Sequence, residues 1–488
     1  MNFAERLLSG KDPGKAALIT LEAEHTYGEL SAAVLGAAGH LVRSGALKGD
    51  CVGIAADNSF LWVVGYLGAI RAGCIAVPIS SQLPPADCRA LIEQTKMRFA
   101  FVEPRLATAA WLAGVTQIHS VTAEAAVELP RASGDDLAAI LFSSGSTGKP
   151  RGVMLSHANL TANTESIAEA LDLSEADRAM QVLPFHYSFG ASVLQTHLLK
   201  GGTVVVDKRF LFPDKVLQRM IETRCTGFAG VPSHYQILLR KSRFKEMHFP
   251  DLRWLQQAGG KLQEAFVREL RAAKPEARIY IMYGATEATA RLSILPHDQL
   301  HARLGSIGRG IPGVKLQVLG ENGKPVLPGE TGEIVAEGAN VSRGYYQDPL
   351  ETAASFRNGR LHTGDLATVD ADGFIYVIGR EKSFLKCGGT RISADRFEEA
   401  LLAFEGIVEV AVVGVPDELQ GEAPAAFVVA RDPSDATFLP RLQKFAQTLP
   451  PVMRPKLIEL VNELPKSAAG KVQRMKLYER LRGSAAAA

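Results

Sequence analysis

Residues 51–79 read CVGIAADNSFLWVVGYLGAIRAGCIAVPI, and their pattern indicates a parallel α/β sheet. Two short apolar runs, 51–56 and 74–79, flank an apolar segment at 60–70. A strand, a helix and a second strand in this order form a βαβ unit, which places both strands parallel in one sheet. The segment 60–70 ends at Arg71, well short of the roughly 20 apolar residues that span a bilayer. We therefore interpret it as a buried helix.

The same alternation continues on both sides of this stretch. Further strand-like runs occupy 16–20 and 99–102, helical patterns occupy 27–44 and 84–94, and four later runs repeat the βα texture at 203–207, 226–232, 254–260 and 278–284. After about residue 305 the sequence changes to short strands with Gly and Pro turns, followed by the charged segment 379–386. We predict an α/β protein: a large N-terminal domain of βα-layered sheets (1–379) with a small β subdomain (about 305–379), and a mobile small α+β C-terminal domain (380–488).

The composition excludes several classes of protein. Of the 488 residues, 54 are Lys or Arg and 52 are Asp or Glu, and they are mixed along the chain without a basic block that would follow a nucleic-acid backbone. The five cysteines are odd in number and lack CxxC or Cys/His spacing, so neither a disulfide framework nor a zinc site is indicated. The N-terminus is charged where a secretory signal would be apolar. We expect a cytoplasmic protein with no membrane span.

A loop rich in Gly, Ser and Thr carries the strongest chemical signal. Residues 141–153 read LFSSGSTGKPRGV, between an apolar strand and a helix that is expected to begin near Ser156. Backbone N–H groups, hydroxyls and a cation in one loop suit a polyphosphate. A Walker-type loop ending at Lys149 would need Gly at Ser143 and Ser or Thr at Pro150, so that alternative fails on spacing.

This segment resembles the phosphate loop of the adenylate-forming superfamily, which comprises acyl-CoA and aryl-CoA synthetases, adenylation domains and luciferases (the AMP-dependent synthetase and ligase family). Arg151 stands where lysine is commoner in that pattern, which keeps the charge. The resemblance implies that the loop binds the phosphates of ATP through Ser143, Ser144, Gly145, Ser146, Thr147, Gly148 and Lys149. Further motifs of this family follow in the expected order.

Three of these motifs concern the nucleotide. YGATEA at 283–288 resembles the family's YGxTE, which implies that Thr286 contacts the α-phosphate and Glu287 binds Mg²⁺, beside Tyr283, Gly284 and Ala285. QAGGK at 257–261 resembles the turn that lies against adenine, with Gly259 and Gly260, although a purely structural turn would look similar. HTGDL at 362–366 resembles the TGD motif, so that Asp365 would accept both ribose hydroxyls and Arg380 would donate to the sugar.

The C-terminal part resembles the family's mobile domain. Lys382 occupies the hinge position, and Gly388 and Gly389 match glycines that line a channel for a thiol arm. Lys386 matches a lysine used in thioester formation by some members, but a solvated charge fits as well. PKSAAGKVQR at 465–474 matches PxxxxGKxxR, which implies that Lys471 bridges the carboxylate and the α-phosphate during adenylation.

PFHYSFG at 184–190 resembles the aromatic motif beside the acyl pocket. Amino-acid adenylation domains usually carry an aspartate where this chain has His186, so an α-amino acid is disfavoured because its ammonium would lack a carboxylate partner. In this motif His186 would shape the pocket mouth and is a candidate catalytic residue, although a histidine in isolation could be a core residue. The pocket is predicted to be apolar, with walls formed by His186, Tyr187, Phe189, Phe228, Val231, Tyr235 and Ala288.

The resemblance implies a two-step ligase. It would use ATP and Mg²⁺ to convert a fatty or aryl acid into an acyl-AMP and would then transfer the acyl group to a thiol. CoA is the first choice of acceptor, and a carrier-protein phosphopantetheine or an amine remains open. A non-catalytic nucleotide-binding relative is disfavoured because Thr286, Glu287, Asp365, Arg380 and Lys471 are all present. A luciferase-like oxidation would be distinguished by oxygen consumption.

Overall fold

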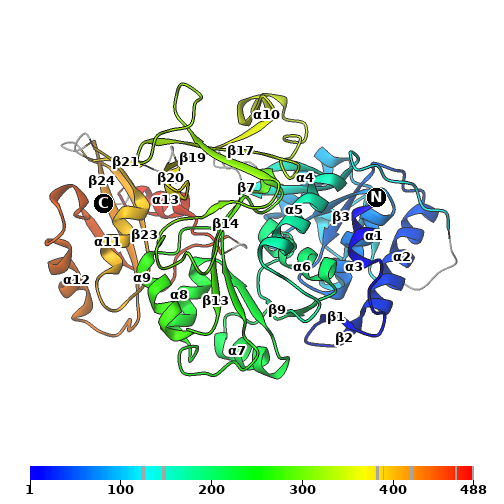
Figure 1. The fold of residues 1–488 in the computed structure, drawn as a ribbon, viewed down its shortest axis with the longest axis horizontal. Helices are drawn as coiled ribbons and strands as arrows, with labels where there is room; N and C mark the ends of the chain where they lie inside the picture. The colour runs from blue at the N-terminus through cyan, green and yellow to red at the C-terminus, as the bar shows by residue number, and fades with distance from the viewer. Residues whose placement is uncertain are drawn as a thin grey trace.

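The structure is a computed structural model that describes residues 1–121, 127–144, 150–380, 384–387, 390–417, 421–467 and 470–485. Two large sheets form the body of the molecule, a β subdomain lies at one edge, and the C-terminal residues form a separate small sheet with its own helices (Figure 1). Within the described residues, no helix is long and apolar enough to cross a membrane.

The first large sheet has six strands in the order β6-β5-β3-β4-β7-β8, parallel except for β8. Helices α3 and α4 connect parallel strands, so the βαβ unit predicted from residues 51–79 is confirmed. The elements are β3 (Cys51–Ala55), α3 (Phe60–Arg71), β4 (Ile75–Pro78), α4 (Pro85–Thr95), β5 (Phe99–Val102), the short 3-10 turns η1 (Pro104–Leu106) and η2 (Ala110–Leu112), β6 (Thr116–Ile118), β7 (Leu137–Ser144) and β8 (Pro150–Ser156).

The second large sheet has nine strands in the order β15-β14-β13-β12-β11-β9-β10-β1-β2. Its six central strands, from β13 to β1, are parallel. Its strands are β1 (Ala16–Ile19), β2 (Glu24–Thr26), β9 (Arg178–Gln181), β10 (Thr203–Val206), β11 (Gly227–Gly230), β12 (Trp254–Gln257), β13 (Arg278–Tyr283), β14 (Ser293–Leu295) and β15 (Arg309–Gly310). The helices around it are α1 (Phe3–Leu8), α2 (Tyr27–Arg43), α5 (His157–Ala170), α6 (Ser188–Lys200), α7 (Pro213–Glu222), α8 (Pro232–Lys241) and α9 (Glu264–Ala273).

The two sheets share one apolar core. A single buried cluster includes Val52 from the first sheet, Val204 from the second, and Leu30, Leu67 and Leu194 from helices α2, α3 and α6. Helices therefore form a layer between the sheets, which explains why 60–70 is apolar on all sides.

Strand β8 was not expected. The sequence predicted a loop that runs directly into a helix near Ser156, but β7 and β8 form an antiparallel pair in which Leu141 lies opposite Val153. Val153 and Leu155 are buried, as expected for a strand paired inside a sheet, and Met154 between them is only partly buried. Helix α5 then begins where predicted, with the Ser156 side chain accepting a hydrogen bond from the Asn159 N–H. The glycine-rich loop therefore connects two strands.

The β subdomain comprises β16 (Val314–Leu319), β17 (Thr331–Gly338), α10 (Pro349–Ser355), β18 (Phe356–Arg357), β19 (Arg360–Val369) and β20 (Ile375–Arg380). The small C-terminal sheet begins with β21 (Phe384–Cys387), so the chain passes from one sheet to another close to residue 379. The domain boundary at 379 stays a prediction. The remaining elements are β22 (Thr390–Ser393), α11 (Ala394–Leu402), β23 (Ile407–Asp417), β24 (Gly421–Ala430), α12 (Phe438–Ala446), the 3-10 turn η5 (Pro451–Met453), β25 (Leu457–Leu460) and α13 (Arg474–Ala485).

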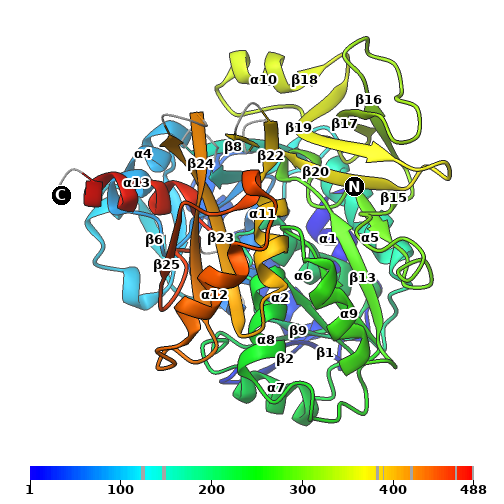
Figure 2. The ribbon, with the colours of Figure 1, turned by 90° about the vertical axis from the view of Figure 1, so that its left-hand side faces the viewer.

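The small domain contacts the large one. Strand β23 lies beside α8 (Figure 2), and Lys261 after β12 forms an ion pair with Glu399 of α11 at 3.3 Å. These contacts position the C-terminal segment over the carboxyl end of the nine-stranded sheet.

One buried and two partly buried histidines are expected to make the fold sensitive to acid. Burial lowers the pKa of His157 to about 4, of His186 to about 4 and of His234 to about 3. Because the unfolded chain binds more protons than the folded chain between about pH 4 and 6.5, stability falls as the pH falls through this window, by up to about 1.4 kcal/mol per pH unit for each histidine.

The measurement is urea unfolding at pH 5 and pH 7. The His157 ring accepts a hydrogen bond from the Phe3 N–H at 3.0 Å, which a protonated ring could not do. His157→Gln should therefore reduce the difference in unfolding free energy between the two pH values, while His248→Gln at an exposed position should leave that difference unchanged. An unaltered pH dependence in His157→Gln would contradict this account.

Candidate active site

The predicted motifs meet at one edge of the nine-stranded sheet. The aromatic motif 184–190 follows β9, Val231 follows β11, the glycine turn 258–260 follows β12, and 283–288 lies at the end of β13. These four strands are parallel, so their carboxyl ends lie at the same edge, where α/β folds place ligands. Segments that are up to a hundred residues apart in sequence are thereby brought together.

Asp365 has two partners at this edge. It lies on β19 directly opposite Arg380 on β20, whose Nε donates to Oδ1 at 3.0 Å, and the Tyr283 hydroxyl donates to Oδ2 at 2.6 Å. Burial, together with the adjacent Asp365 carboxylate, raises the pKa of Tyr283 well above its usual range. The Asp365 side chain is 10% exposed and that of Arg380 is 62% exposed, so the carboxylate is held in place while the guanidinium faces solvent.

Thr286 and Glu287 lie on the short 3-10 turn η3 (Thr286–Ala288) that follows β13. The Thr286 hydroxyl is 3.3 Å from that of Ser188, and Glu287 Oε1 accepts a hydrogen bond from the Tyr345 hydroxyl at 2.9 Å. Gly284 is required for the turn, since a Cβ there would lie 1.8 Å from the Ala290 carbonyl oxygen. The turn thus carries a hydroxyl and a carboxylate at consecutive positions.

Lys471 comes from the small domain. Its loop is closed by backbone hydrogen bonds from the Ser467 N–H to the Lys471 oxygen and from the Gly470 N–H to the Ser467 oxygen, both at 2.8 Å. The Lys471 ammonium lies 5.2 Å from the centroid of the Tyr187 ring, in the aromatic motif of the large domain. Ser233 at the start of α8 donates to the Gly470 oxygen at 3.2 Å. The lysine is therefore held at the same edge as Thr286.

The glycine turn after β12 lies beside this lysine. Gly259 has a φ of +85°, and a Cβ there would lie 2.7 Å from the Tyr187 hydroxyl and 3.8 Å from Lys471 Cε. A Cβ on Gly260 would lie 3.3 Å from Pro232. Both glycines let the backbone pack closely against Tyr187 and Pro232, and their contact with adenine stays a prediction.

The residues of the predicted pocket wall belong to more than one apolar cluster. Tyr187, Phe189 and Val231 belong to one apolar cluster, in which the Tyr187 and Phe189 rings meet edge to face at 6.4 Å. Phe228 instead belongs to the core on the other face of β11 from Ala229, because neighbouring residues of a strand point to opposite faces. Tyr235 of α8 packs in the same core as Phe228.

Ala288 also lies apart, against Ala336 and Leu361 of the β subdomain. Phe228, Tyr235 and Ala288 thus pack in other clusters than Tyr187, and their part in the pocket wall stays a prediction. His186 is partly buried, and burial holds its pKa at about 4, so its ring is neutral at pH 7.

The structure describes three of the remaining predicted residues. Ser143 and Ser144 end strand β7, and Lys386 lies on β21 with an exposed side chain and with its N–H donating to a Glu422 carboxylate oxygen at 2.7 Å. The others lie outside the described residues: Gly145, Ser146, Thr147, Gly148, Lys149, Lys382, Gly388 and Gly389.

Two residues of this region were missed. Tyr345 orients Glu287 from a distant part of the chain, and no sequence signal connects the two. Arg291 is fully buried next to Phe189, with its guanidinium carbon 4.5 Å from the ring centroid. The sequence did contain a signal for Arg291, because it is the only charged residue among the apolar and small residues of 288–295.

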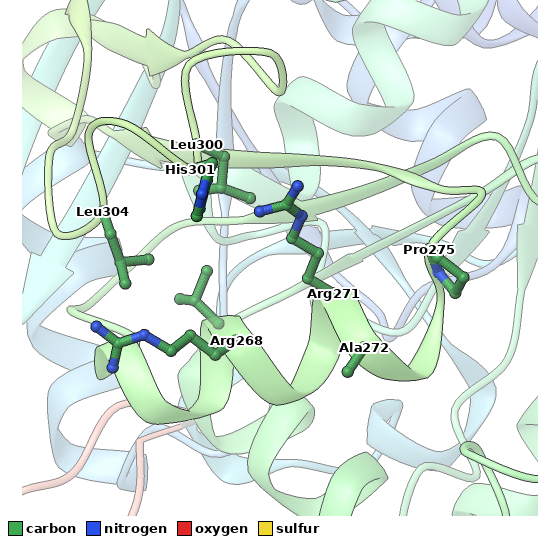
Figure 3. Close-up of a pocket in the computed structure, with 8 residues that line it drawn as sticks. Arg268, Arg271, Ala272, Pro275, Leu300, His301 and Leu304 are labelled. Atoms are coloured by element: carbon green, nitrogen blue, oxygen red, sulfur yellow. The ribbon is translucent and has the colours of Figure 1, made fainter.

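A separate hollow lies at the end of α9. It encloses about 460 Å³ and its surface includes two arginines and a histidine (Figure 3); the lining residues are Val267, Arg268, Arg271, Ala272, Pro275, Leu300, His301 and Leu304. None of the predicted site residues that the structure describes lines it.

A nucleotide-type site at the strand ends of an α/β domain, completed by a lysine from a small C-terminal domain, is the arrangement of an adenylate-forming enzyme. The chain belongs to the AMP-binding enzyme family: the AMP-binding enzyme model matches residues 8–346, and the model of the AMP-binding enzyme C-terminal domain matches residues 396–471. The predicted superfamily and fold class are confirmed.

Similar proteins include feruloyl-CoA synthase of an Amycolatopsis species, which is 32% identical and aligned over 92% of each chain. Another is 2-succinylbenzoate–CoA ligase of Bacillus licheniformis, at 28% identity over 95% of this chain and 97% of that protein. Among solved structures, the anthranilate CoA ligase AuaEII in complex with anthranoyl-AMP has a TM-score of 0.90 at 26% identity, covering 100% of this chain and 98% of the other. ATP-bound MatB from Rhodopseudomonas palustris has a TM-score of 0.88 at 29% identity, with 98% of both chains covered.

Proposed function

We propose that this protein is an ATP-dependent acid–CoA ligase, which converts a carboxylic acid into an acyl-AMP with release of pyrophosphate and then into a thioester. The observation that carries the proposal is the approach of Lys471 to Tyr187 across the two domains, at 5.2 Å, beside the turn that contains Thr286. The similarity to CoA ligases over nearly the whole chain supports the same reaction.

In the first step, a carboxylate oxygen of the acid attacks the α-phosphorus of ATP, and the bond to the bridging oxygen of pyrophosphate breaks. Lys471 is proposed to neutralise the two oxyanions that approach each other, and the Thr286 hydroxyl to bind the α-phosphate. Asp365 is proposed to accept the ribose hydroxyls beside Arg380. The loop from Ser143 to Lys149 is proposed to bind the remaining phosphates.

The residues also fit a magnesium ion. Among the described residues, no group of three or more His, Cys, Asp or Glu side chains could hold a metal by itself. Mg²⁺ in nucleotide sites is usually bound by one or two carboxylates together with the phosphates, so a single oriented carboxylate is sufficient. Glu287, with Oε1 fixed by Tyr345, provides one. The ion would offset charge on the phosphates.

In the second step, a thiol sulfur attacks the acyl carbon, AMP leaves, and the thiol proton is released. We propose that the small domain turns about Lys382 and presents Gly388, Gly389 and Lys386 to the acyl-AMP. CoA is the proposed acceptor, and a carrier-protein phosphopantetheine or an amine would be alternatives. A cytoplasmic location is also proposed, supported by the use of ATP and CoA and by five free cysteines.

Acid-dependent release of pyrophosphate from ATP tests this function. The assay covers fatty, aryl and amino acids, each with and without CoA. We expect release with one class of acid and a CoA-dependent increase with formation of the thioester. Release that CoA leaves unchanged would indicate another acceptor, and the absence of release with every acid would contradict the proposal.

A bulky residue at Gly389 should impair the second step selectively. Gly389→Val is expected to reduce thioester formation by about 10²-fold, because a side chain in a narrow channel displaces the thiol from the acyl carbon, while pyrophosphate release is retained. Gly14→Val is a matched control, since a Cβ at Gly14 would meet only the Asp12 carboxylate, at 3.6 Å. Equal losses in both steps would argue against a thiol channel at Gly389.

A further inference from the structure

One arginine is buried against the aromatic motif 184–190, which is predicted to lie beside the acyl pocket. Arg291 lies between η3 and β14, four residues after Glu287, and is only 1% exposed. Its backbone is held by Asn163 of α5, which donates to the Arg291 oxygen at 2.8 Å and accepts from its N–H at 3.1 Å, and by Asn340, which donates to the same oxygen at 3.2 Å. Hydrogen bonds to its backbone therefore hold Arg291 in place without a contribution from its side chain.

The Arg291 guanidinium has few partners for a buried cation. Nη2 lies 3.5 Å from the Ser192 hydroxyl, the outer limit of a hydrogen bond, and Nε has no hydrogen-bond partner in the described part of the chain. No described carboxylate forms an ion pair with it, although a guanidinium has five donors. Burial lowers the pKa of Arg291 to about 10, so the side chain is still a cation at neutral pH.

A purely structural role does not account for this arrangement. The Phe189 ring, 4.5 Å from the guanidinium carbon, offers a cation–π contact, which offsets only part of the cost of removing a charge from water. Packing against Phe189 alone would be served as well by leucine or methionine, without that cost. The planar fork of donors matches a carboxylate or sulfonate, which would complete the charge and the missing hydrogen bonds.

A series of contacts connects Arg291 with Lys471 and Thr286, the residues proposed to act in adenylation. Phe189 meets Tyr187 edge to face at 6.4 Å, and Tyr187 lies under the Lys471 ammonium at 5.2 Å. Ser188, between the two aromatic residues, is 3.3 Å from the Thr286 hydroxyl. The pair of rings formed by Tyr187 and Phe189 therefore has one cation, Lys471, against Tyr187 and another, Arg291, against Phe189.

We propose that Arg291 binds a second anionic group of the substrate, a carboxylate or a sulfonate, at the end remote from the carboxylate that is adenylated. This proposal rests on the proposed function of the site and narrows its substrate to acyl or aryl acids with two acidic groups. The apolar part of such an acid would lie along Tyr187 and Phe189, in agreement with the predicted apolar wall of the pocket.

The first test measures binding without turnover. Calorimetry with the full-length protein, Mg²⁺ and a non-hydrolysable ATP analogue compares matched pairs of acids: isophthalate with benzoate, glutarate with valerate, and adipate with hexanoate. We expect the diacid of at least one pair to bind about 100-fold more tightly than its partner, because only the diacid completes the buried charge.

Variants test whether the tighter binding of diacids depends on Arg291. Arg291→Met should remove it by weakening the diacid about 100-fold, and Arg291→Lys, which keeps a cation, should retain part of it. Arg309→Met is the matched control, since the Arg309 guanidinium carbon also lies near an aromatic ring, 4.2 Å from the Phe374 centroid, but at an exposed position. Binding of the ATP analogue verifies that each variant is folded.

The outcomes separate this proposal from the proposed function. Equal binding within every pair, no binding of any diacid, or the same loss in Arg309→Met would overturn the role of Arg291. If a diacid binds through Arg291 but releases no pyrophosphate from ATP, the ligase function fails and the binding role stands. If only the monoacids release pyrophosphate, the ligase stands and the role of Arg291 falls.

Discussion

Lys471→Ala is expected to reduce acid-dependent pyrophosphate release by about 10²- to 10³-fold. The reacting carboxylate and α-phosphate are both anionic, and Lys471 is the cation that the small domain places beside Tyr187 at 5.2 Å. A loss of this size corresponds to about 3–4 kcal/mol of transition-state stabilisation. Because the partners of this charge belong to the substrates, ATP binding and the unfolding transition should change little.

Lys476→Ala provides the control, since this lysine lies five residues further on and is exposed. A second readout is thioester formation from supplied acyl-AMP, which Lys471→Ala should retain because adenylation is bypassed. A variant that adenylates at the wild-type rate would remove Lys471 from the mechanism. Loss of both half-reactions together would instead indicate damage to the small domain.

Asp365→Asn is expected to lower kcat/KM for ATP by about 10²- to 10³-fold. The carboxylate accepts hydrogen bonds from Tyr283 and Arg380, and it is proposed to accept both ribose hydroxyls as well. An amide has one acceptor oxygen and no charge, so two charge-assisted hydrogen bonds of about 1.5–3 kcal/mol each would be weakened. Steady-state kinetics with varied ATP measure the effect.

Tyr283→Phe separates the role of Asp365 in binding from its role in the fold. This change removes one donor to the carboxylate and leaves the charge, so the loss should stay within about 10-fold. Thermal unfolding of both variants reports any damage to the pairing of β19 with β20. A wild-type KM for ATP in Asp365→Asn would contradict the assignment of Asp365 to the ribose.

The local motifs could be predicted because their chemistry depends on neighbours in sequence. Gly284 must be glycine because the backbone turns back on Ala290, and Gly470 and Lys471 share one loop closed by hydrogen bonds within 465–473. The alternation of apolar runs likewise predicted strands such as β3 and β4, because a buried parallel strand is apolar along its whole length. The antiparallel strand β8 was missed, since its short alternating run follows a glycine-rich loop.

Spacing along the chain determined the superfamily and the parallel sheets, and it predicted which residues bind or react, because each motif is a turn or loop whose geometry is local. Only the tertiary structure decided which residues share a wall. Phe228 and Val231 lie three residues apart but in different cores, while Tyr345 reaches Glu287 from 58 residues away. The unpaired charge of Arg291 also became visible only there, because burial and the absence of a described anionic partner depend on packing between segments distant in sequence.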